Sequence, residues 1–218
     1  MSLPDGVRRR QFGDEESLAT KGAPVYGEPV VDGWRRWDPH RSKLGAMLEC
    51  GLDTGLDGGE TVLYLGAAAG TTVGHVADFA GPTYAVEFAA RPMRDLLDVA
   101  ADRPTLFALL KDAREPETYA HVVEPVDVVV QDVATRGQAD VALANRQFLT
   151  AGDAGADGRL LAAIKARSED VTADPEDVFA DALAALEDGY EILATDSLAP
   201  YHDDHLGVVA RPLDDRTF

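Results

Sequence analysis

The stretch that decides the fold reads Val62-Leu63-Tyr64-Leu65-Gly66-Ala67-Ala68-Ala69-Gly70-Thr71-Thr72. Its four apolar residues predict a strand buried on both faces, and the small residues after them predict a tight turn into a helix over 72–79. Such a turn lets a ligand approach the backbone and directs the free N–H groups of the helix at it. Because the turn lacks a phosphate-loop lysine and the strict dinucleotide spacing, it indicates a ligand without phosphates.

Apolar runs alternate with helical patterns on the C-terminal side of this stretch, which predicts an α/β fold with a largely parallel sheet. The last two runs follow one another without a helix between them, so we expect an antiparallel pair at one edge of a seven-stranded sheet. The expected strands are 61–65, 83–86, 105–110, 126–130, 160–164, 190–197 and 205–210. The expected helices are 72–79, 91–101, 117–123, 138–149 and 175–187.

The N-terminal side of the stretch differs in composition, because residues 1–58 are rich in Gly, Pro and Arg. Short extended pieces at 23–26 and 29–31 predict a small β-rich appendage, followed by a helix over 39–50 that Asp38 can cap. A glycine-rich linker follows at 51–59. We therefore expect two units, an appendage with its linking helix over 1–58 and the α/β domain over 59–218, with a surface loop at 152–158.

Charge is the most unusual property of the chain, since 39 acidic and 20 basic residues give a net charge of −19. The acids are 26 Asp and 13 Glu, and the bases are 16 Arg and only four Lys. Large net charge is a feature of halophilic proteins, because concentrated salt shortens the Debye length to about 3 Å and screens the carboxylates from one another. The composition therefore favours a halophilic source, and an acidic protein that binds basic partners is the alternative.

Several protein classes are disfavoured. No run approaches the roughly 18 apolar residues of a membrane helix, and residues 1–10 lack the apolar stretch of a signal peptide, so we expect a cytoplasmic protein. The single cysteine, Cys50, predicts neither an internal disulfide nor a zinc site, and we expect no metal.

Acidic side chains follow three of the expected parallel strands. Glu87, Asp112 and Asp132 come directly after the second, third and fourth strands. Ligands of open α/β sheets bind outside the carboxyl ends of the strands, so these acids should lie near the glycine turn. Glu87 can accept from both hydroxyls of a ribose, and Asp112 can accept from an adenine amino group. S-adenosylmethionine fits this pattern, since nearby carboxylates tolerate its positive charge, and a nicotinamide dinucleotide fits less well.

The sequence resembles the fibrillarin family of box C/D ribonucleoproteins in its short archaeal form. The resemblance rests on segments in family order, namely 37–44, 62–78, 84–88, 112–114, 126–134, 164–166 and 200–205. It implies a Rossmann-like class I methyltransferase fold that uses S-adenosylmethionine. Together with the glycine turn, it implies cofactor contacts at Gly66, Thr71, Thr72, Glu87, Phe88, Asp112, Ala113, Asp132, Val133, Ala134 and Thr135. Thr135 stands where the family usually has Gln, and the loop at 81–83 is shorter than in the family.

The resemblance also implies an activity, the 2′-O-methylation of ribose in rRNA and in tRNA. The matching catalytic positions are Lys43, Asp132, Lys165 and His205, with Lys165 nearest to the hydroxyl. The implied partners are a Nop-domain scaffold, a kink-turn-binding ribosomal-type protein, a box C/D guide RNA and the target RNA that it presents. The net charge agrees with presentation by partners, because a chain this acidic should not bind RNA unaided.

Some alternatives stay open at the level of sequence. The chain could be a non-catalytic assembly subunit, a free methyltransferase for small molecules or, at a greater distance, a nicotinamide oxidoreductase. Residues 8–10, three arginines, are expected to form a solvated tail, with RNA contact as the alternative. Trp34 and Trp37 are expected to anchor the appendage to the core, with base stacking as the alternative.

Overall fold

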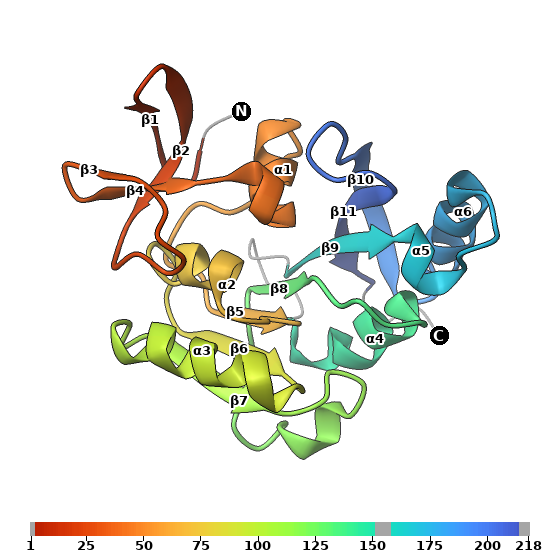
Figure 1. Ribbon diagram of the computed structural model, residues 1–218. Helices are drawn as coiled ribbons and strands as arrows, with labels where there is room; N and C mark the ends of the chain where they lie inside the picture. The colour runs from red at the N-terminus through yellow and green to blue at the C-terminus, as the bar shows by residue number, and fades with distance from the viewer. Residues whose placement is uncertain (1–2, 151–157, 214–218) are drawn as a thin grey trace.

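The computed structural model describes residues 3–150 and 158–213, so most of the loop expected at 152–158 lies outside the described residues. Its centre is a seven-stranded sheet with the order β10-β11-β9-β8-β5-β6-β7 (Figure 1). The strands are β5 (Val62–Leu65), β6 (Thr83–Glu87), β7 (Leu106–Leu110), β8 (Val128–Gln131), β9 (Arg159–Lys165), β10 (Tyr190–Ser197) and β11 (His205–Pro212). The five strands from β9 to β7 are parallel, and β11 and β10 are antiparallel. The predicted mostly parallel sheet with an antiparallel edge pair is confirmed.

Both faces of the sheet are covered, which explains the unbroken apolar run at its centre. Val62 and Tyr64 of β5 face the cluster that contains residues of α2 (Thr71–Val76) and α3 (Ala90–Ala101). Leu63 and Leu65 face the opposite cluster with residues of α4 (Gln138–Asn145) and α6 (Pro175–Leu186). A short α5 (Ala166–Glu169) follows β9. Successive side chains of a strand point to opposite faces, so every position of β5 has to be apolar.

Two of the helices expected after β7 differ from the structure. The helix expected over 117–123 is wrong, since only the 3-10 turn η2 (Pro116–Thr118) forms there. Tyr119 is buried, and its hydroxyl donates to the Asn145 side chain, which holds this segment in turns against the sheet. The helix expected over 138–149 is α4 followed by the 3-10 turn η3 (Arg146–Phe148), and the Asn145 amide donates to Ala113 and Val141 carbonyls where α4 ends.

The N-terminal segment forms a separate antiparallel sheet with the order β1-β2-β4-β3, which projects from the main sheet in Figure 1. Its strands are β1 (Arg8–Phe12), β2 (Glu15–Lys21), β3 (Val30–Val31) and β4 (Trp34–Trp37). The β-rich character is therefore confirmed, while the expected extended piece at 23–26 is not a strand. The expectation of a solvated tail at residues 8–10 is wrong, because they belong to β1.

The two tryptophans have different roles. Trp37 is fully buried and stacks on His75 of α2, with ring centroids 4.9 Å apart, so its prediction as an anchor is confirmed. Trp34 is half-buried and lies under two cations of its own sheet instead. Because Trp37 shares one apolar cluster with Val73 and Val76, the small sheet packs on the main domain. The boundary near residue 58 stays a prediction.

The helix expected over 39–50 is divided into two parts. The Asp38 carboxylate accepts from the His40 N–H at 2.9 Å and caps the 3-10 turn η1 (Pro39–Arg41). The Ser42 hydroxyl accepts from the Gly45 N–H at 3.0 Å and caps α1 (Lys43–Glu49). This second cap starts the helix at Lys43. Within the described part of the chain, no helix is long and apolar enough to cross a membrane.

Candidate active site

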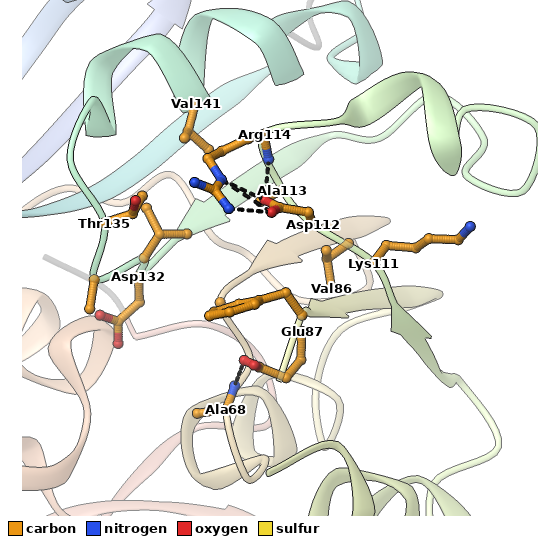
Figure 2. A pocket seen from close by; sticks show the side chains of 14 residues that line it. Ala68, Val86, Glu87, Lys111, Asp112, Ala113, Arg114, Asp132, Thr135 and Val141 are labelled. Atoms are coloured by element: carbon orange, nitrogen blue, oxygen red, sulfur yellow. Dashed lines mark hydrogen bonds and ion pairs between the residues drawn. The ribbon is translucent and has the colours of Figure 1, made fainter. Parts of the chain in front are cut away.

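A cavity of about 410 Å³ opens beside the carboxyl ends of the central parallel strands, within the size range of ligand pockets (Figure 2). Its lining includes every predicted cofactor residue except Thr71 and Thr72. The lining residues are Gly66, Ala68, Val86, Glu87, Phe88, Lys111, Asp112, Ala113, Arg114, Asp132, Val133, Ala134, Thr135 and Val141. The structure thus brings together side chains that the sequence separates by as many as 75 positions.

Glu87, at the end of β6, is held in one orientation by backbone donors. One carboxylate oxygen accepts from the Ala68 N–H at 2.9 Å and the other from the Ala89 N–H at 2.7 Å. The residue is buried, and Figure 2 shows its carboxylate pointing at the glycine turn. Ala68 has a φ of 47°, a left-handed conformation that is uncommon for alanine, and the bond to Glu87 stabilises it. The remaining lone pairs of the carboxylate can accept from a ligand's hydroxyls.

The glycine turn is shaped by close approach as well as by backbone angles. Gly66 has a φ of 82°, and a Cβ placed on it would lie 2.4 Å from the carbonyl oxygen of Asp132. No other residue fits at this position, so the strand ends of β5 and β8 can lie against one another. Thr71 and Thr72 open α2 beyond the turn, and Thr72 is buried beside the Tyr64 hydroxyl. The structure therefore does not place these two threonines on the cavity wall.

Asp112 lies on the opposite wall of the cavity and is paired with Arg114. The Arg114 guanidinium donates to both carboxylate oxygens, with Nε–O distances of 3.0 and 3.1 Å, and the Arg114 N–H donates at 2.9 Å. Hydrogen bonds from Arg114 lower the pKa of the Asp112 carboxyl. Phe88 is 71% exposed at the mouth of the cavity. A charged acceptor opposite a bare aromatic ring suits a purine with an amino group.

The four predicted catalytic positions come from four elements. The Lys43 Nζ at the start of α1 lies 3.2 Å from an Asp132 carboxylate oxygen just after β8. Lys165 ends β9, and His205 begins β11 directly opposite Lys165 in the strand register. The described residues, 3–150 and 158–213, place no carboxylate within 4.0 Å of the Lys165 Nζ. Among the described residues, Lys165 thus forms no ion pair, whereas Lys43 does.

The charges of Lys43 and Asp132 both act on the His205 ring. Burial lowers the pKa of His205, while its bond to the Asp203 carbonyl and the nearby charge of Asp132 act in the opposite direction. The charge of Lys43 lowers this pKa further. Because a carbonyl can only accept, the His205 Nδ1, 2.7 Å from the Asp203 oxygen, is the protonated nitrogen. The Nε2 therefore carries the acceptor lone pair of the neutral ring.

Sequence reasoning missed a buried polar clamp beneath Lys165. The Gln138 side chain accepts from the Lys165 N–H at 2.9 Å and donates to the Lys165 carbonyl at 3.1 Å. Gln131 in turn donates to the Gln138 carbonyl at 2.8 Å. Both glutamines are buried. A glutamine after a glycine at a helix start offers no spacing signal, so only the fold reveals this role.

Two further residues were also missed. His202 bonds through Nε2 to the Pro39 carbonyl at 2.8 Å, which joins the chain before Lys43 to the loop before His205. Lys111 follows β7, and Figure 2 shows its side chain extending away from Glu87 and Asp132. The sequence analysis singled out acidic residues that follow strands, so it gave no reason to expect His202 or Lys111. Among the described residues, no group of three or more His, Cys, Asp or Glu could hold a metal ion.

A mixed seven-stranded sheet of this order, with a glycine turn after β5 and acids after β6, β7 and β8, defines a Rossmann-like methyltransferase fold. The fibrillarin family model matches residues 5–213. The chain therefore belongs to the fibrillarin family. It is 72% identical over 215 residues to the fibrillarin-like rRNA/tRNA 2′-O-methyltransferase of Haloarcula marismortui, covering 99% of this chain and 100% of that one.

Solved structures agree with this assignment. The chain is similar to fibrillarin in a fibrillarin/Nop5p complex, with a TM-score of 0.87, 40% identity and coverage of 98% of this chain and 100% of that one. It is also similar to Aeropyrum pernix fibrillarin with natively bound S-adenosyl-L-methionine, with a TM-score of 0.79, 40% identity and 94% coverage of both chains. The similarity to proteins of salt-loving archaea supports the halophilic origin expected from composition.

Proposed function

We propose that this chain is the catalytic subunit of a guide-RNA-directed particle and methylates the 2′-hydroxyl of ribose in rRNA and in tRNA. The observation that supports this most directly is the Lys43–Asp132 pair beside the cofactor-sized cavity, with Lys165 and His205 adjacent in the strand register. The names of the relatives support the same activity. A cytoplasmic location stays a prediction.

The cavity residues fit S-adenosylmethionine. Glu87 would accept from the two ribose hydroxyls, since backbone N–H groups already aim its carboxylate into the cavity. Asp112 would accept from the adenine amino group, and Phe88 and Ala113 would flank the adenine ring. Val133, Ala134 and Thr135 would line the remaining wall. When bound, S-adenosylmethionine supplies an electrophilic methyl group on a positively charged sulfur.

The acceptor side has to orient a weak nucleophile and remove its proton. Lys165, which has no ion pair among the described residues, is the group nearest the hydroxyl and offsets the negative charge that develops on the oxygen. Asp132 and Lys43 hold each other and fix the ribose. The Nε2 of His205 is a neutral acceptor for the departing proton, because burial lowers the pKa of this ring.

Partners have to deliver the RNA to this rim. The chain has 20 basic side chains against 39 acidic ones, and concentrated salt weakens phosphate contacts further, so the isolated chain should bind RNA weakly. The fibrillarin/Nop5p complex supports a Nop-domain scaffold as one partner. A kink-turn-binding ribosomal-type protein and a box C/D guide RNA complete the proposed particle. Sequence specificity then comes from base pairing between guide and target.

The test measures tritiated methyl transfer by the assembled particle with Lys165→Ala and with Asp132→Ala. Each variant should lose at least about 100-fold in turnover, the range of general acid–base and orienting groups. Calorimetry should show that Lys165→Ala binds S-adenosylmethionine as the wild type does, because Lys165 lies outside the cavity wall. Arg94→Ala, an exposed cation on α3, is the matched control.

Each alternative gives a different result. Turnover near that of the wild type in both variants would refute the catalytic assignment. A wild-type particle that assembles but transfers no methyl would indicate a non-catalytic subunit. Methyl transfer to free nucleosides without guide RNA would indicate a small-molecule enzyme.

A further inference from the structure

The outer face of the N-terminal sheet is unlike the rest of this acidic chain. Side chains directly opposite one another in an antiparallel pair share a face, and successive residues alternate between faces. Leu18 and Trp37 are paired and buried in the core, so their face is the inner one. The register then places five long side chains together on the outer face, namely Arg8, Arg10, Lys21, Trp34 and Arg36.

Two of these cations have no acidic partner in the part of the chain that the structure describes. Arg36 is paired with Glu15 at 2.7 Å, and Arg8 lies 3.9 Å from Asp5. For Arg10 and Lys21, the described ranges 3–150 and 158–213 contain no carboxylate within 4.0 Å of the charge. Lys21 is also one of only four lysines in the chain, and the other three are Lys43, Lys111 and Lys165 at or beside the candidate site. The outer face therefore has a local excess of positive charge.

Trp34 holds Arg10 and Lys21 in place. The Arg10 guanidinium carbon lies 5.1 Å and the Lys21 Nζ 5.2 Å from the centre of the Trp34 ring, both within the range of cation–π attraction. Each of these side chains has about 2 kcal/mol of rotamer entropy to lose on binding an anion. Stacking on the indole restricts them before any ligand arrives. The arrangement is a pre-ordered pair of positive charges on an exposed sheet face.

We propose that this outer face docks the RNA backbone of the particle, with Arg10 and Lys21 contacting phosphates. The inference rests on the proposed function and adds to it a second RNA-binding surface, away from the methyl-transfer rim. Charge complementarity favours RNA as the occupant, because a nucleic-acid backbone carries a negative charge on every nucleotide. At high salt the Debye length is about 3 Å, so only cations in direct contact contribute, and pre-ordered side chains make such contact at the smallest entropic cost.

The first experiment compares two charge-neutralised variants in the reconstituted particle. In Arg10→Gln/Lys21→Gln, the apparent KM for target RNA should rise at least about fivefold. The slope of log KM against log salt concentration should fall by about 1.4 to 1.8, as expected for two lost phosphate contacts. Binding of S-adenosylmethionine should be unchanged. The control Arg91→Gln/Arg94→Gln removes the same charge from the exposed surface of α3 and should leave both values within twofold. An equal KM and an equal salt slope in the two variants would overturn the proposal.

A second measurement does not depend on turnover. Lysines are acetylated with an N-hydroxysuccinimide ester and read by mass spectrometry, with Lys21 in the protein assembly without RNA as the reference. Lys21 should become at least about threefold less reactive when guide and target RNA join the protein assembly, because a bound phosphate shields its Nζ. Protection that is already complete before RNA is added would assign the face to the scaffold protein and refute the RNA proposal. If the wild-type particle transfers no methyl, the proposed function fails, yet the reactivity of Lys21 still decides the docking question.

Discussion

Two ion pairs join the same two parts of the chain, and they differ in burial. Arg35 of β4 meets Asp78 after α2 at 2.7 Å, with side chains 0% and 2% exposed. Lys43 of α1 meets Asp132 after β8 at 3.2 Å, with side chains 28% and 22% exposed. Both pairs connect the N-terminal segment to the main domain. The buried Arg35–Asp78 pair can therefore only hold the two parts together, whereas the partly exposed Lys43–Asp132 pair can also contact a substrate.

The buried pair is part of a closed network. Asp78 also accepts from Arg103 at 3.0 Å and from the Thr20 hydroxyl at 2.6 Å, and Arg35 donates to Glu28 at 2.5 Å. Burial raises the pKa of Asp78, while the two arginines act in the opposite direction. A buried ionic network of this kind is weak evidence that the charges stabilise the fold on balance. Removing one member is nevertheless costly, because it leaves the remaining members as uncompensated buried charges.

Asp78→Ala should therefore have the largest effect. It leaves Arg35 and Arg103 buried with no shared carboxylate, which typically costs about 3–5 kcal/mol of unfolding free energy. Denaturant unfolding in concentrated salt measures this loss. Asp98→Ala, on the exposed surface of α3, should change stability by less than about 0.5 kcal/mol. A loss below about 1 kcal/mol for Asp78→Ala would mean that the two sheets are joined by apolar packing alone.

Glu87 is an intermediate case, a buried carboxylate that has backbone N–H partners and forms no ion pair with the described residues. Glu87→Gln keeps the size of the side chain but has only one acceptor oxygen, so it cannot serve Ala68, Ala89 and two ligand hydroxyls. We expect S-adenosylmethionine to bind about 1.5–3 kcal/mol more weakly, the value of a hydrogen bond to a charged group. Calorimetric titration measures the affinity, with the exposed Glu115→Gln as control. Equal affinities in the two variants would exclude Glu87 as a ligand-binding group.

The parts of the molecule that the sequence predicted share one physical cause. A strand buried on both faces needs an uninterrupted apolar run, so β5 and its turn were visible directly. Parallel strands end at one edge of the sheet, so Glu87, Asp112 and Asp132 were expected together, and all three line the cavity. These features are local patterns with a fixed geometric consequence.

The parts that were missed depend on polar groups with distant partners. The β1–β2 hairpin lacks an apolar alternation in β1, because the inward position at Arg9 is filled by a cation that bonds to Glu49 of α1. Gln138 clamps Lys165 from 27 positions away, and no spacing rule links a glutamine to a strand end. The local sequence around Tyr119 predicts a helix, and the hydrogen bond from its hydroxyl to Asn145, which holds the segment in turns, could not be predicted.

The buried Arg35–Asp78 network also predicts how stability depends on pH, because His75 contacts it through Thr20. Its Nδ1 lies 2.7 Å from the Thr20 hydroxyl, which donates its own proton to Asp78, so Nδ1 is the donor. Burial, followed by the charges of Arg35 and Arg103, holds the pKa of His75 well below its ordinary value of about 6.5. A depressed histidine pKa means that the unfolded chain binds the proton first. The folded state therefore loses stability as pH falls below about 6.5.

The expected loss from His75 is on the order of 1 kcal/mol between pH 7 and pH 5.5. His202 and His205 also have lowered pKa values and add loss of the same sign. His75→Asn keeps a donor near the Nδ1 position and removes the titration, so its unfolding free energy should fall by about 1 kcal/mol less over this range. Denaturant unfolding at both pH values in each protein gives the two differences. Equal differences would show that His75 takes up its proton without unfolding.

The exposed pair should give the smallest change in stability. Lys43→Gln removes an ion pair that is about one-quarter exposed, and such pairs contribute about 0–1 kcal/mol to the unfolding free energy. Methyl transfer in the particle should nevertheless fall at least about 100-fold, because Asp132 loses the partner that orients it toward the ribose. Glu191→Gln, which breaks the exposed pair with Arg211 on the edge strands β10 and β11, is the matched control and should leave turnover within about threefold. A loss of about 3 kcal/mol of unfolding free energy in Lys43→Gln would mean that this pair is structural, like the buried network. Unchanged turnover would mean that the pair is only a surface contact. Either result would contradict the proposed difference between the two pairs.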